Sequence, residues 1–107
     1  MKLLSVKIVE YADNSQPGWV RCIFNDAQGK QWSIVEKVPI VTTDWLDSDS
    51  AYPQLGVVAC QIISERIHEN NRKVLTIDIS IPNAIETEEG QTQFDVVADQ
   101  VSGEYSQ

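Results

Sequence analysis

The chain is poor in cations, and the last of them is Lys73. Residues 74–107 contain seven Asp and Glu residues and no Lys or Arg, whereas residues 1–73 contain nine acids and eight cations. Almost all of the formal net charge of −8 therefore comes from the C-terminal third. Because affinity for phosphates comes mainly from Lys and Arg, this balance argues against nucleic acid as a ligand. The excess of negative charge instead favours binding to a protein partner with a basic surface, or it serves only to keep the protein soluble.

Signals for a membrane or for export are also missing. No run approaches the ~20 apolar residues that a membrane-spanning helix requires. The apolar residues near the N-terminus are interrupted by Lys7 and Glu10, so they do not make the hydrophobic core of a signal peptide. With only two cysteines, the composition predicts a cytoplasmic protein with reduced thiols and no membrane association.

Few residues are suited to nucleophilic catalysis or metal binding. Cys22 and Cys60 fall at apolar strand positions, where a free cysteine behaves as a small buried hydrophobe. His68, the one histidine, falls in a polar turn, whereas a catalytic Cys–His pair requires contact between the two side chains. A structural zinc site would need about four such ligands. The sequence therefore predicts no metal and no cofactor.

Other catalytic and ligand-binding motifs are absent. Asp44, Asp47 and Asp49 crowd one segment, but the glycine and glutamate of a calcium-binding EF-hand loop are missing there. Glycine-rich phosphate loops and a G-x-S-x-G elbow are absent as well. An enzyme that uses carboxylates alone, such as Glu36, Asp78 and Asp95, ranks last among the alternatives. We expect a protein that is not an enzyme.

Apolar residues alternate with a period of two along most of the chain. This pattern predicts strands at 3–11, 19–25, 30–37, 57–64, 73–81 and 92–99. Asp26-Ala27-Gln28-Gly29 predicts a tight turn between the second and third of them. The segment 38–41 is expected to stay extended, with Pro39 at an edge or corner.

Short strands joined by turn signals indicate an all-β fold. We predict a small antiparallel β-barrel of about six or seven strands, with a β-sandwich as the alternative. Residues 1–100 would form the single domain, and residues 101–107 a flexible C-terminal tail.

Two sets of residues are candidates for binding. Trp19, Trp45 and Tyr52 lie beside turns or in the polar segment, where they either plug the ends of a barrel or remain exposed to a partner or sugar. The second set is acidic. The alternation in the last two strands predicts that their acids point outward, beside a cluster at the turn between them; the candidates are Asp78, Glu86, Glu88, Glu89, Asp95 and Asp99.

Four stretches stand out when they are read together: Gly18-Trp19-Val20-Arg21-Cys22, Glu36-Lys37-Val38-Pro39, Tyr52-Pro53-Gln54-x-Gly56 and Ile85-Glu86-Thr87-x-x-Gly90. The set, which spans most of the chain, resembles a group of small bacterial proteins of unknown function. The resemblance implies a compact β-barrel of the type seen in the second domain of translation elongation factors. It also implies a bacterial origin, and it supplies no catalytic residue.

The leading functional hypothesis is a non-enzymatic module that binds another protein. An acidic immunity-type inhibitor of a basic toxin is one concrete form of it, and a regulatory protein is another. The alternative is a small-molecule or carbohydrate-binding domain that uses the exposed aromatic residues. The oligomeric state is left open.

Overall fold

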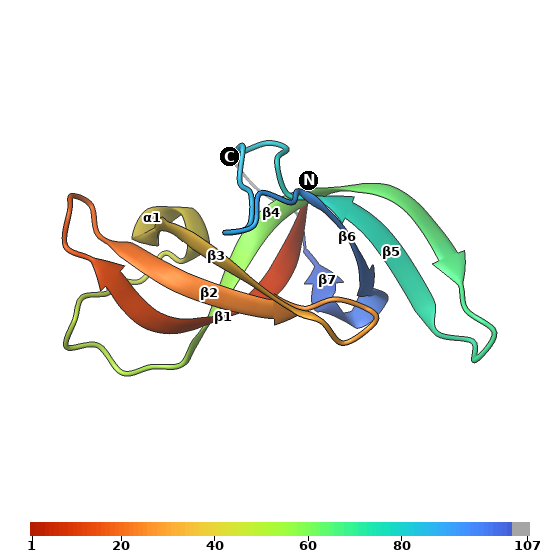
Figure 1. The fold of residues 1–107 in the computed structure, drawn as a ribbon, viewed down its shortest axis with the longest axis horizontal. Coiled ribbons are helices and arrows are strands. Elements are labelled where there is room, and N and C mark those ends of the chain that lie inside the picture. Colours follow the sequence, from red (N-terminus) through yellow and green to blue (C-terminus); the bar gives the residue numbers. More distant parts are fainter. Residues whose placement is uncertain (104–107) are drawn as a thin grey trace.

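The computed structural model of the chain describes residues 1–103, and these form one curled, all-antiparallel β-sheet (Figure 1). The spatial order of the strands is β3-β2-β1-β4-β5-β6, and β7 pairs with β1. The strands are β1 (Lys2–Asp13), β2 (Trp19–Asn25), β3 (Gln31–Lys37), β4 (Gln54–Ile67), β5 (Lys73–Asp78), β6 (Gln93–Val97) and β7 (Val101–Ser102). This architecture confirms the predicted all-β fold, in the form of an open half-barrel.

The long strand β4 gives the sheet its curl. Its first half, from Gln54 to Cys60, pairs with β1, and its second half, from Gln61 to Ile67, pairs with β5. The register shifts between Ile62 and Ser64, and such an irregularity bends a strand and increases its twist. Because β4 belongs to both halves, β5 and β6 swing round toward the β2–β3 hairpin (Figure 1).

The core fills the concave side of the sheet. In β1, Leu4, Val6 and Ile8 are buried, while Ser5 and Lys7 between them are exposed, as the period of two requires. Each fully buried side chain of this size contributes roughly 1.5–3 kcal/mol through removal of apolar surface from water. The same alternation runs through β2, β3 and β6, whereas β4 buries three consecutive residues (Val58, Ala59 and Cys60) and β5 buries residues of both parities.

Aromatic packing joins β6 to the β2–β3 hairpin across the open side of the half-barrel. The ring of Phe94 in β6 lies edge-on to Phe24, at 5.2 Å between centroids, and to Trp32, at 4.9 Å. The Ala27 N–H donates to the Asp95 carbonyl at 2.8 Å, which ties the β2–β3 turn to β6. Packing and a few loop hydrogen bonds thus join β6 to the hairpin, and no ladder runs between β6 and β3 in the described part of the chain.

The segment 38–41 differs from its prediction. It forms a short helix, α1 (Val38–Val41), instead of an extended path. Pro39 lies in its first turn, where a helix does not need the missing N–H. The helical turn buries both Val38 and Val41, and the Val38 N–H donates to the Gly18 carbonyl at 3.0 Å. Tertiary anchoring therefore decides the conformation of this segment.

The C-terminal elements are shorter than predicted. β5 ends at Asp78, because its carboxylate accepts hydrogen bonds from both the N–H and the hydroxyl of Ser80 and so turns the chain. After β6 the chain forms a 3₁₀ turn, η1 (Ala98–Gln100), followed by β7. Val101 and Ser102, assigned above to a flexible tail, pair with Leu4 and Leu3 of β1. Residues 104–107 of that tail lie outside the described residues.

Candidate binding surface

Most of the acids predicted to form an outward negative surface are engaged by other side chains. Arg21 donates to both oxygens of Glu88, with Nε 3.1 Å from Oε2 and Nη2 3.3 Å from Oε1, and it also pairs with Glu10. The hydrogen bond from Arg21 is the main reason that the pKa of Glu88 is lowered. The Ser33 hydroxyl also donates to this carboxylate. Glu89 lies 3.8 Å from Lys30.

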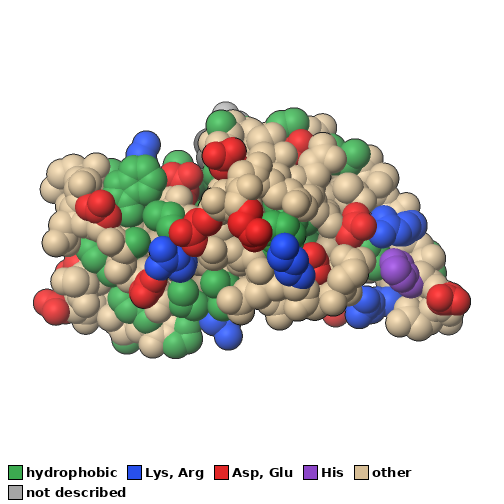
Figure 2. All heavy atoms as spheres, in the orientation of Figure 1, with side chains coloured by type: hydrophobic (Ala, Val, Ile, Leu, Met, Phe, Trp, Pro, Cys, Tyr) green, Lys and Arg blue, Asp and Glu red, His purple; other side chains and the backbone are tan. Residues whose placement is uncertain are grey.

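Asp95 is held in the same way. Arg66 Nη2 donates to its Oδ2 at 2.8 Å, and the Thr76 hydroxyl donates to its Oδ1 at 2.6 Å. These bonds, that from Arg66 first, lower the pKa of Asp95. Acidic and basic side chains accordingly lie next to one another across the middle of the face in Figure 2. The charges that are segregated in sequence are therefore mixed in space.

The prediction that Asp78 points outward is wrong. Its side chain is only 7% exposed, and its Oδ2 accepts a hydrogen bond from Gln93 Nε2 at 3.1 Å. Donors from Ser80, chiefly the hydroxyl, lower its pKa. The chain after β5 stays beside the segment that precedes β6, since the Ile79 N–H donates to the Thr92 carbonyl at 2.9 Å. Of the predicted acids, Glu86 and Asp99 are exposed and form no ion pair with any described residue.

The three candidate aromatic residues differ sharply in exposure. Trp19 is half-buried, and Lys37 Nζ lies 5.5 Å from its ring centroid. Tyr52 is half-buried as well, and its hydroxyl donates to the Asp47 carbonyl at 2.8 Å. Trp45, by contrast, is 80% exposed. Trp19 and Tyr52 have contacts that account for their positions, whereas Trp45 has most of its indole in water.

Trp45 belongs to the segment 42–53, which carries three acids and no cation. Leu46 is buried and anchors this segment to the core. Asp47 Oδ1 accepts the Asp49 N–H at 2.9 Å, which shapes the turn. Within residues 1–103, Asp44, Asp47 and Asp49 form no ion pair. The segment therefore presents uncompensated negative charge beside an exposed indole.

A hollow of about 470 Å³ lies against Trp45. It forms where the β1–β2 turn, α1 and the start of segment 42–53 meet, at the end of the molecule opposite the β4–β5 turn (Figure 1). We call this region the Trp45 face, made up of Pro17, Val38, Pro39, Thr42, Thr43, Asp44 and Trp45. Its lining is largely apolar, Asp44 is the carboxylate that lines it, and Asp47 and Asp49 follow Trp45 in the same segment of the chain.

The cysteines and the histidine do not form a reactive group. Cys22 and Cys60 are both fully buried, and burial raises the pKa of Cys22 to about 12 and that of Cys60 to about 11. Both thiols are therefore protonated at neutral pH, and a thiol is not the nucleophilic form. His68 lies in the β4–β5 turn, where its N–H donates to the Arg72 carbonyl.

Two further findings concern metals and membranes. In the part of the chain that the structure describes, no three His, Cys, Asp or Glu side chains are grouped so that they could hold a metal ion. No helix among the described residues has the length and apolar character needed to cross a bilayer.

Comparison with protein-family models, with curated proteins and with solved structures gives no match. The resemblance to small bacterial barrel proteins therefore stays a prediction, and functional inference rests on the geometry described above.

Proposed function

We propose that this protein is a non-enzymatic binding module that recognises a basic surface of another protein through the Trp45 face. The observation that supports this proposal is the exposed indole of Trp45, in a segment whose carboxylates form no ion pair with any residue that the structure describes. Exposed tryptophan keeps apolar surface in water, and a partner that covers it recovers the free energy of burial. Tryptophan is also among the residues that dominate the energetics of protein interfaces.

Electrostatics supports the same choice of partner. The net charge of −8 attracts a cationic protein over long range, and the unpaired carboxylates of Asp44, Asp47 and Asp49 supply local complementarity. A Lys or Arg side chain laid over the indole would add a cation–π interaction. An immunity-type inhibitor of a basic toxin is one concrete form of this function, and a regulatory subunit of a basic protein is another.

A carbohydrate or other small molecule is the second candidate. It is favoured by the lining of the hollow, where Thr42 and Thr43 lie beside Trp45 and can offer hydroxyl groups next to an aromatic platform. Trp19 and Tyr52 do not extend this platform as freely exposed rings, because both are half-buried. We therefore rank the protein partner first.

The test is affinity capture at low salt with matched variants. We expect a basic protein to be retained by the wild type and by Glu69→Gln, and to be lost with Trp45→Ala and weakened with Asp44→Asn. Glu69→Gln is the control because Glu69 is also exposed but lies in the β4–β5 turn, far from the Trp45 face. Trp45→Ala should leave stability within about 0.5 kcal/mol, since the side chain is 80% exposed.

Capture that is equal for all four proteins would show that net charge alone attracts the partner, and the proposal would then be wrong. A glycan panel that quenches or shifts the Trp45 emission, with no protein retained, would favour the second candidate. The variant Trp45→Phe identifies the share of the emission that belongs to Trp45.

A further inference from the structure

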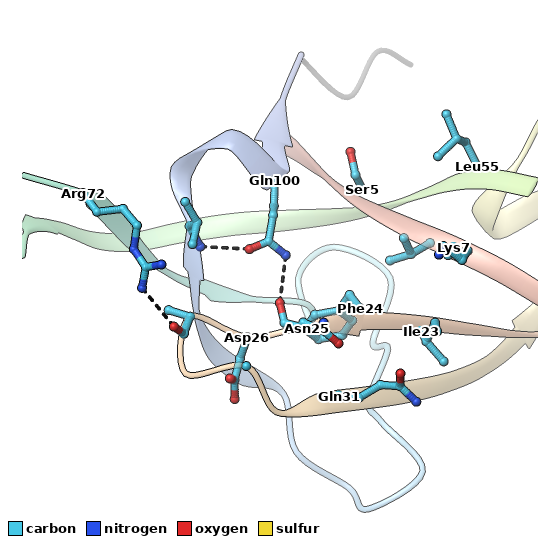
Figure 3. Close-up of a pocket in the computed structure, with 14 residues that line it drawn as sticks. Ser5, Lys7, Ile23, Phe24, Asn25, Asp26, Gln31, Leu55, Arg72 and Gln100 are labelled. Carbon is cyan, nitrogen blue, oxygen red and sulfur yellow. Dashed lines mark hydrogen bonds between the residues drawn. The ribbon is translucent and has the colours of Figure 1, made fainter. Parts of the chain in front are cut away.

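A second surface lies where β1 and β2 separate. On one edge of β1, β7 pairs with Leu3 and Leu4, and β2 joins only from Lys7, which lies opposite Ile23. Between these pairings the strands leave a groove of about 630 Å³ (Figure 3). Its floor and sides are lined by Val6, Phe24, Val97, Ser5, Asn25 and Gln100.

The groove contains two cations that have no carboxylate partner among residues 1–103. Other cations already have partners: Arg21, Lys30 and Arg66 form the ion pairs described above, Lys73 Nζ lies 3.2 Å from Glu65 Oε1, and Lys37 lies over Trp19. Lys7 and Arg72 form no ion pair with a described residue, and both line the groove. In a chain with sixteen acids and eight cations, two cations that line one groove and form no ion pair with a described residue favour an anionic ligand.

Asp26 is the carboxylate that lines the groove, and it already accepts hydrogen bonds from other groups of the protein. Asp26 Oδ1 accepts the N–H groups of Gln28 at 3.0 Å and Lys30 at 2.9 Å. Its Oδ2 accepts Trp32 Nε1 at 2.9 Å. Asp26 is thus used to hold the β2–β3 turn, and the groove keeps an excess of positive charge.

Arg72 uses a side-chain N–H donor within the fold and keeps others for a ligand. Its Nη2 donates to the Ala27 carbonyl at 3.0 Å, which fixes the guanidinium at the wall of the groove. A guanidinium carries five N–H donors, so the others remain available to a carboxylate. In Figure 3, Arg72 lies at one end of the groove, and Lys7 and Leu55 lie at the other.

The Lys7 end also has an apolar anchor point. Leu55 of β4 lies opposite Lys7 in the β1–β4 register and is 84% exposed. Ile23 of β2, on the other side of Lys7, is half-buried. The backbone beside the two cations runs four residue steps, from Ile23 opposite Lys7 to Ala27, whose carbonyl accepts from Arg72, and four steps span at most ~13 Å at a strand rise of about 3.3 Å.

We propose that this groove binds an extended acidic peptide segment of a protein partner, with acids four residues apart and an apolar residue midway between them. In an extended chain, residues i, i+2 and i+4 point to the same side. The acids at i and i+4 then reach Lys7 and Arg72, and the apolar residue at i+2 packs on the apolar floor. The side-chain amides of Asn25 and Gln31 can bond the peptide backbone, whereas the Gln100 amide is engaged by the Val97 N–H and the Asn25 carbonyl. This site is independent of the Trp45 face.

The test uses the peptide acetyl-Glu-Ser-Leu-Ser-Glu-amide as the probe, with amide chemical shifts of the full chain as the readout at low salt. We expect shifts at residues 5–7 and 23–27. We expect affinity to fall about two- to fivefold in Lys7→Gln and in Arg72→Gln, as for single exposed charge pairs. Lys37→Gln, which lies outside the groove, is the matched control, and Arg72→Lys should retain most of the affinity that depends on charge.

Three results would overturn the proposal. One is equal affinity for the probe and for its analogue in which both Glu are replaced by Gln. Another is binding that is unchanged in both groove variants. The third is concentration-dependent shifts at the same residues without peptide, which would assign the groove to a second copy of the chain. Trp45→Ala should leave peptide binding unchanged, so failure at one surface is distinguishable from failure at the other.

Discussion

Replacing Phe94 by alanine should open the half-barrel. Phe94 is 4% exposed and is the residue of β6 that packs against both Phe24 and Trp32 of the β2–β3 hairpin. Truncation of a buried phenylalanine costs about 3–5 kcal/mol, which includes the cavity that remains. A typical domain has only about 5–15 kcal/mol of stability in total. We expect Phe94→Ala to lower the free energy of unfolding by about 4–5 kcal/mol, the upper part of the range for a buried phenylalanine. The reason is that edge-to-face ring pairs add about 0.5–1.5 kcal/mol beyond burial.

The expected loss follows from how β6 is attached. β6 lies at the end of the strand order, and its links to the hairpin are the ring contacts and hydrogen bonds such as that from Ala27 N–H to the Asp95 carbonyl. Without the ring, this side of the core is open to water, and the emission of Trp32 should shift to the red in the native state. Phe94→Leu keeps most of the apolar volume and should lose distinctly less.

Urea unfolding, followed by both tryptophan fluorescence and far-ultraviolet circular dichroism, measures the effect. Ile81→Ala is the control, since that side chain is 38% exposed and lies outside the buried core. A loss below about 1 kcal/mol for Phe94→Ala, or one equal to the control, would mean that the aromatic contacts do not hold β6 in place.

Two further predictions concern titratable groups. Because burial raises the pKa of Cys22 to about 12 and that of Cys60 to about 11, neither thiol should react with a disulfide reagent at pH 8 until the protein is unfolded; rapid labelling of the native protein would contradict this. The folded pKa values of Asp78 and Asp95 lie below their ordinary value of 3.8, so the unfolded state binds more protons as the pH falls through that value. Stability should be fully present above about pH 5, decline with acidification below it, and decline less steeply in Asp78→Asn; equal acid slopes for the two proteins would refute this.

The fold could be predicted from the sequence where local interactions determine the conformation of the backbone. β2 begins at Trp19 and ends at Asn25, as the alternation predicts, and Asp26 makes the turn that follows through hydrogen bonds to Gln28 and Lys30. The helix α1 could not be predicted, because four residues with two buried valines suit either conformation. A contact with the distant Gly18 carbonyl selects the helix, and no local pattern signals it.

Charge placement was less predictable than strand placement. An antiparallel sheet brings residues far apart in sequence into register, so Arg21 meets Glu88 and Arg66 meets Asp95. Sequence order cannot show these pairings. The exposure of Trp45 agrees with one of its two predicted roles, whereas the sequence around Asp44 suggests only an incomplete calcium loop. The absence of any Lys or Arg from 42–53 is the feature of the sequence that could have indicated Asp44 as a binding residue.

The net charge is therefore a poor guide to which charges a partner can use. Ion pairs at the surface engage Glu88, Glu89 and Asp95 of the C-terminal third, whereas the acids of segment 42–53 form no ion pair with a described residue. Lys7 and Arg72 remain available in a separate groove despite the overall negative sign. A partner that responded only to net charge would be affected equally by Asp44→Asn and Glu69→Gln. A partner seated on the Trp45 face responds to the first of these changes and is indifferent to the second, because only Asp44 borders the exposed indole.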